Sequence, residues 1–114
     1  MTRNDFRRIA LGFPGTSESA HQNHPDFRVC GKIFATVGYP DAQWAMVKLT
    51  PEQQNEFVEA DPAAFVRVKG GWGRKGATNV KLRAAKKATV RSALATAWCN
   101  VAPRRLAKEF EAGL

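Results

Sequence analysis

The chain has 114 residues, of which 44% are hydrophobic and 25% charged, which is typical of one folded domain and excludes a disordered chain. No apolar run reaches the roughly 18 residues of a membrane span, and the first residues lack the apolar core of a signal peptide, so we expect a cytoplasmic protein without membrane contact. The net charge is +8, but residues 1–61 carry six Lys/Arg and eight Asp/Glu, whereas residues 62–114 carry twelve and two. This basic second half predicts a polyanionic partner.

The N-terminal half predicts a helix, a run of strands and a second helix. Residues 2–12 form the first helix, with Thr2 as N-cap and Asp5 in the capping-box position. Residues 17–49 alternate between apolar and polar side chains, which predicts antiparallel strands with breaks at Gly31 and at residues 38–41. Residues 50–60 form the second helix, because Thr50, Pro51 and Gln53 provide a capping box with proline at N1.

The stretch from Phe65 to Leu82 predicts two strands joined by a glycine-rich turn. Val66 and Val68 alternate with cations, which is typical of a half-buried strand, and the glycines at 70 and 71 allow the chain to reverse. Trp72 falls within this turn. We therefore expect a long, flexible, cationic hairpin with an aromatic side chain at its tip, suited to a nucleic-acid groove.

The C-terminal part predicts a connector over residues 83–88 and two helices. Between residues 89 and 101, apolar side chains recur with helical spacing, giving a stripe that includes Leu94 and Trp98. Pro103 begins a last helix with Leu106 and Phe110 facing inward.

Three patterns could indicate other chemistry. Gly71, Gly73 and Gly76 spell G-x-G-x-x-G, but an extended segment follows and the chain lacks acidic residues between Asp61 and Glu109, so a dinucleotide site is disfavoured. The grouping His21, His24, Asp26 and Cys30 matches no metal-finger spacing and offers no orienting group for a cysteine nucleophile. We expect no catalytic residues, metal or cofactor. Cys30 and Cys99 are expected to be buried, reduced thiols.

Several motifs together resemble the MmcQ/YjbR family of small bacterial proteins. They span nearly the whole chain: HPDFRV (24–29), GKIFAT (31–36), VKLTPEQ (47–53), GWGRKG (71–76), Ala97-Trp98 and APRRL (102–106). The resemblance implies a single α+β domain over residues 1–114, an antiparallel sheet flanked by N-terminal and C-terminal helices in the YjbR/CyaY-like arrangement, also described as a double-wing DNA-binding fold. The frataxin-like fold raises iron binding, although Glu52, Glu56 and Glu59 give only a hint of an acidic ridge. The family supplies no settled catalytic residues.

Two functions remain open. The first is a non-enzymatic module that binds DNA with weak sequence preference, with cations neutralising phosphates and Trp72 stacking on a base or wedging into the minor groove. Its predicted contact residues are Arg67, Lys69, Trp72, Arg74, Lys75, Lys81, Arg83, Lys86, Lys87 and Arg91. The alternative is a protein-interaction or small-ligand module in which Trp72 and Trp44 line an apolar pocket. The sequence does not predict the oligomeric state.

Overall fold

The computed structural model describes residues 1–21 and 24–112, which form an α+β domain built on one antiparallel sheet. Its strands are β1 (Thr16–His21), β2 (His24–Val29), β3 (Lys32–Val37), β4 (Trp44–Lys48), β5 (Phe65–Arg67) and β6 (Ala77–Lys81). They lie in the order β1-β2-β3-β4-β6-β5, and every neighbouring pair is antiparallel. The strands expected over residues 17–49 and the pairing of the two strands on either side of the glycine-rich turn are confirmed.

The helices are α1 (Arg3–Leu11), α2 (Pro51–Ala60), α3 (Gly71–Arg74), α4 (Lys87–Val101) and α5 (Arg104–Ala112). Both predicted capping boxes are present, since Thr2 with Asp5 begins α1 and Thr50 with Gln53 begins α2. Helix α4 begins at Lys87, earlier than expected from the apolar stripe, because the exposed first turn contributes little to that stripe. None of the described helices is long and apolar enough to cross a membrane.

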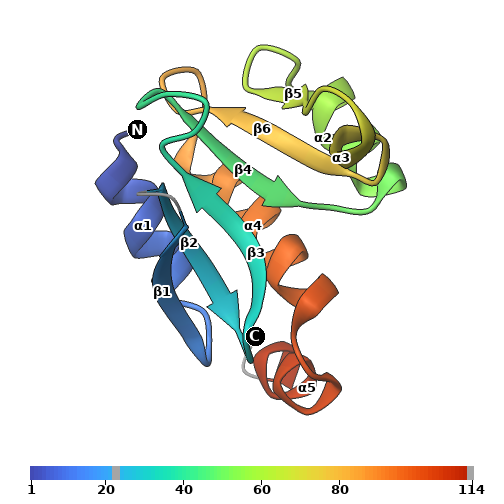
Figure 1. Ribbon diagram of the computed structural model, residues 1–114. Helices are drawn as coiled ribbons and strands as arrows, with labels where there is room; N and C mark the ends of the chain where they lie inside the picture. The colour runs from blue at the N-terminus through green and yellow to red at the C-terminus, as the bar shows by residue number, and fades with distance from the viewer. Residues whose placement is uncertain (22–23, 113–114) are drawn as a thin grey trace.

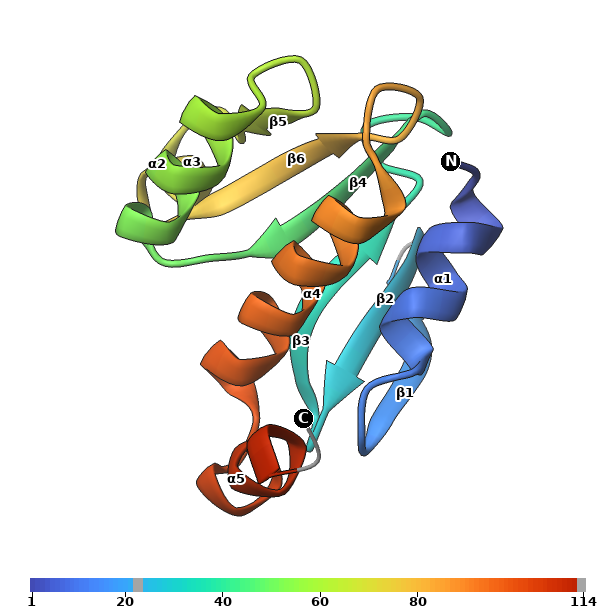
Figure 2. The same cartoon turned by 180° about the vertical axis from the view of Figure 1, so that it is seen from behind.

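Helices α1, α2 and α4 lie on one side of the sheet, as Figures 1 and 2 show from opposite directions. Side chains from α1 and α4, such as Phe6, Leu94 and Trp98, pack against the inward faces of the strands and are fully buried. On β4, Ala45 and Val47 point into this core, while the alternate side chains point to the other face. The opposite face of the sheet is therefore left without a covering helix.

Two expectations about local burial were wrong. In β5 the inward residue is Phe65, whereas Val66 is 41% exposed, because Phe65 pairs with the buried Val80 on β6 and packs against Phe57 of α2. Cys30 is an exposed turn residue with a positive φ of 50°, while Cys99 is half-buried on α4. Both thiols are free.

Candidate nucleic-acid interface

The glycine-rich segment between β5 and β6 is a packed turn, which corrects the expectation of a long flexible hairpin. β5 ends at Arg67, and residues 71–74 form the single helical turn α3 before β6 begins. A Cβ at Gly73 would lie 1.6 Å from the carbonyl oxygen of Val68, and one at Gly76 would lie 1.9 Å from that of Leu49. Because backbone occupies the space a side chain would need, these two glycines allow the segment to pack tightly against its neighbours.

The buried side chain of Gln54, on α2, holds this turn in place through hydrogen bonds. Its Nε2 group donates hydrogen bonds to the carbonyl oxygens of Gly73 (3.0 Å) and Ala77 (2.9 Å), and the side chain is 3% exposed. One amide therefore joins α2 to both α3 and the start of β6. Buried amides are costly to leave unpaired, so this arrangement holds the position of the turn.

Trp72 projects from this fixed turn and is 66% exposed. The Nζ atom of Lys48, at the end of β4, lies 5.7 Å from the centre of the Trp72 ring, within the range of a cation–π interaction. Sequence reasoning did not include Lys48 among the site residues. Alternation along β4 placed its side chain on the outward face, but only the tertiary structure brings that face next to Trp72.

A groove of about 620 Å³ opens beside the Trp72 ring. Leu49, Pro51, Ala77 and Val101 provide apolar walls; the other lining residues are Lys48, Thr50, Gly71, Lys75 and Asn100. The lining residues among the described part of the chain include two lysines and no carboxylate. Trp44 does not line the groove, so the expected pocket between Trp44 and Trp72 is wrong.

Asn100 closes the end of the groove formed by α4. Its Nδ2 group donates to the carbonyl oxygen of Lys48 (3.1 Å) and to Oε1 of Gln53 (2.8 Å). These contacts connect the last turn of α4 to the end of β4 and to the capping box of α2. The groove walls therefore come from five elements, β4, α2, α3, β6 and α4, that are joined to one another by hydrogen bonds.

The ten predicted contact residues fall into two groups at opposite ends of β6 (Figures 1 and 2). Lys69, Trp72, Arg74 and Lys75 are exposed on or beside α3, together with Arg67, whose guanidinium donates to Asn55 of α2. The second group lies at the other end of β6, at the start of α4 or within it: Lys81, Arg83, Lys86, Lys87 and Arg91. The five-residue strand between them spans roughly 15 Å, so the cations do not converge on one spot.

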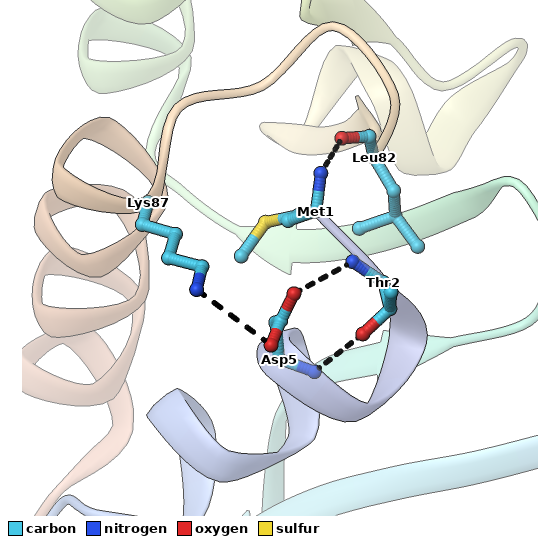
Figure 3. Close-up of polar contacts among 5 residues, drawn as sticks. All are labelled: Met1, Thr2, Asp5, Leu82 and Lys87. Atoms are coloured by element: carbon cyan, nitrogen blue, oxygen red, sulfur yellow. Dashed lines mark hydrogen bonds and ion pairs between the residues drawn. The ribbon is translucent and has the colours of Figure 1, made fainter.

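Two members of the second group already have intramolecular partners. Lys87 lies 3.8 Å from Asp5, whose carboxylate also accepts from the backbone N–H of Thr2 (Figure 3). That backbone hydrogen bond, with a smaller contribution from Lys87, lowers the pKa of Asp5. Arg91 places its guanidinium 5.7 Å from the centre of the Phe13 ring. Lys87 therefore contacts α1, and Arg91 contacts the segment that follows it.

The same corner holds the amino group of Met1, which donates to the carbonyl oxygen of Leu82 at 3.0 Å (Figure 3). This hydrogen bond joins the beginning of the chain to the end of β6. Together with the Lys87–Asp5 pair, it connects the N-terminal segment to the chain between β6 and α4.

Asp26 and His24, two of the residues considered as metal ligands and disfavoured by their spacing, have other contacts. Asp26 is 1% exposed and accepts hydrogen bonds from Nε and Nη2 of Arg28, at 2.8 and 3.1 Å. This pairing raises the pKa of Arg28. His24 lies edge-on to Tyr39, with ring centres 5.4 Å apart. The side chain of His21 is outside the described residues. Glu52, Glu56 and Glu59 are exposed on α2.

Comparisons with known proteins support a family assignment. The YjbR family model matches residues 11–100. The fold is similar to the crystal structure of Deinococcus radiodurans protein DR2400, which carries a DUF419 domain; the TM-score is 0.71 at 17% identity, covering 96% of this chain and 88% of that one. A comparison with curated proteins finds no match.

Proposed function

The chain belongs to the YjbR family, and on this premise we propose that it is a non-enzymatic DNA-binding module whose contact surface is centred on Trp72. The observation that carries the proposal is the exposed Trp72 ring held beside Lys48 on a turn that Gln54 fixes in place. Base–aromatic stacking and phosphate neutralisation are the two interactions by which proteins bind nucleic-acid strands without reading sequence. Weak sequence preference follows from this chemistry.

The cations that serve this surface are those near α3. Lys69, Arg74 and Lys75 are exposed on the segment that carries Trp72, and Lys48 lies against its ring. Arg67 is less available because its guanidinium bonds Asn55. We therefore assign about four phosphate contacts to this surface, fewer than the nine cations that the sequence suggested for DNA contact.

We expect affinity for a fluorescein-labelled oligonucleotide to fall with salt, with a slope of log K against log salt of roughly −3 to −4 for four contacts. Arg74→Ala with Lys75→Ala should make this slope about 2 units less steep. Trp72→Ala should weaken binding by about 1–3 kcal/mol through lost stacking, while the melting temperature stays unchanged because the ring is exposed. Fluorescence anisotropy across a salt series measures the affinities.

The matched control is Arg104→Ala with Arg105→Ala, which removes the same charge from exposed positions on α5. Equal loss of affinity in both double variants would show that binding depends only on net charge. Failure of the wild-type protein to bind at about 50 mM salt would exclude the DNA function.

The groove favours a second candidate function, binding of a small anionic ligand. Its volume of about 620 Å³ lies within the usual range for ligand pockets, and Lys48 and Lys75 line it. Saturable quenching of Trp72 fluorescence by a small aromatic anion, in a protein that does not bind oligonucleotides, would favour this function over the first.

A further inference from the structure

Figure 1 views the face of the sheet that no helix covers. The strands bear a row of partly exposed side chains on this face. Trp44, Met46 and Lys48 of β4 alternate with the fully buried Ala45 and Val47. The antiparallel register sets Trp44 opposite Lys81 and Met46 opposite Asn79 on β6. Next to Asn79, Val66 of β5 is 41% exposed. Apolar surface of this kind, left uncovered, is typical of a binding face.

The charges of this face are complementary to a polyanion. The described strands contain two acidic residues, Glu18 and Asp26. Glu18 is paired with Arg7 of α1, on the side of the sheet that the helices cover, and Asp26 is neutralised by Arg28. Within the described part of the chain, Lys48 and Lys81 have no carboxylate within 4 Å. The face therefore presents cations without nearby carboxylates to balance them.

Two tryptophan–lysine pairs mark the ends of β4. Lys48 lies against Trp72 at one end, and Trp44 lies directly opposite Lys81 at the other. Lys48 lies four positions after Trp44, which corresponds to roughly 13 Å along a strand. Aromatic side chains next to cations on an open sheet suit unpaired bases, whose rings stack while the phosphates contact the lysines.

We propose that the uncovered face of β4 and β6 extends the Trp72 surface into a track for single-stranded nucleic acid, with one base on Trp72 and another on Trp44. Lys48 and Lys81 contact the intervening backbone. This inference rests on the proposed function and specifies its substrate. The bases of a duplex are enclosed within their own stack, so a half-buried tryptophan on a sheet surface is accessible to unpaired bases and not to paired ones.

The first test uses tryptophan fluorescence. In a Trp72→Phe variant, the remaining indoles are Trp44 and Trp98, and Trp98 is 0% exposed, so quenching by an added oligonucleotide reports Trp44. We expect a 12-nucleotide oligothymidine to quench this variant saturably, and a duplex of equal length to leave its fluorescence unchanged. Absence of quenching by the bound single strand would overturn the track.

The second test measures affinity by anisotropy. Trp44→Leu should weaken binding of the 12-nucleotide strand about 5- to 150-fold, the loss expected from one stacked base. Lys81→Gln, which removes a cation without altering the core, should weaken it and make the salt slope about 0.7 units less steep. Lys86→Gln, an exposed lysine beyond β6, is the matched control and should have no effect. Lys81→Gln also provides a valid test if Trp44→Leu does not fold.

The results separate this inference from the proposed function. If Trp72→Ala weakens binding as expected while Trp44→Leu and Lys81→Gln leave it unchanged, the track is wrong and the Trp72 surface stands. If the wild-type protein binds no single strand but binds duplex, the single-stranded assignment is wrong. If the wild-type protein binds neither single-stranded nor duplex DNA, both the track and the proposed DNA-binding function are wrong.

Discussion

At the scale of single residues, the three tryptophans occupy three different environments. Trp98 is fully buried between α4 and the core, with its Nε1 group donating to the carbonyl oxygen of Pro14 at 3.0 Å. Trp44 is half-buried on the uncovered face of the sheet, and Trp72 is 66% exposed. Spacing placed Trp98 in the buried stripe of α4 and Trp44 on the face of β4 opposite Ala45 and Val47. It left the exposure of Trp72 open, because periodicity carries no information about an aromatic in a turn.

The two cysteines give a prediction at this scale. Burial, with a smaller contribution from Glu111, raises the pKa of the Cys99 thiol, whereas Cys30 is exposed in a turn. Because the thiolate is the reactive form, Cys99 stays protonated at a pH where an ordinary thiol begins to ionise. We expect iodoacetamide at pH 8 to alkylate Cys30 first, as measured by mass spectrometry of tryptic peptides. Equal rates for the two residues in the folded protein would contradict the burial of Cys99.

At the scale of elements, α3 shows how a short turn becomes a fixed platform. Four residues do not form a stable helix by themselves, so the position of α3 depends on the contacts that surround it. Gly73 and Gly76 allow the close approach of backbone, and the Gln54 amide bonds two carbonyl oxygens of the segment. The exposed tryptophan is therefore carried by a segment whose own order comes from α2.

Removing the Gln54 amide tests this dependence. Gln54→Leu keeps most of the buried volume but leaves the carbonyl oxygens of Gly73 and Ala77 without these donors, so we expect a loss of about 1–3 kcal/mol in the free energy of unfolding. Urea denaturation measures the loss. The exposed neighbour Glu56→Leu, on the same helix, is the control and should change stability by less than about 0.5 kcal/mol.

At the scale of the whole molecule, two groups of cations that follow one another in the sequence lie at opposite ends of β6. The group near α3 surrounds Trp72 and the groove, while Lys87 and Arg91 contact α1 and Phe13. In the second group, Arg83 and Lys86 are exposed but lie beyond the far end of β6. The cations that give the chain its net charge of +8 therefore do not form one continuous binding site.

This separation predicts that the cations beyond the end of β6 contribute little to DNA binding. Arg83→Ala with Lys86→Ala should change the salt slope by less than the roughly 0.9 units of one phosphate contact, whereas the Arg74 and Lys75 double variant changes it by about 2. Both variants lose two charges, so the anisotropy series compares position at constant net charge. Equal changes in slope would indicate that the bound strand continues beyond Lys81 to Arg83 and Lys86.

The sequence by itself determined the features that depend on residues close together in the chain. Capping boxes join residues three positions apart, and strand and helix periodicities recur within one element, so the ends of α1 and α2, the strands of the first half and the buried stripe of α4 were predictable. The set of motifs also predicted the YjbR family, which the family comparison supports. The basic character of the second half was likewise readable from composition.

Only the tertiary structure decided which of these residues share a surface. The contact between Lys48 and Trp72, the bond from Gln54 to Gly73 and the groove end formed by Asn100 join residues that are 19 to 52 positions from their partners. Strand register and the packing of helices on the sheet determine such contacts, and a pattern of neighbouring residues in the sequence specifies neither. For the same reason the sequence placed ten residues in one site, whereas the sheet divides them between two ends.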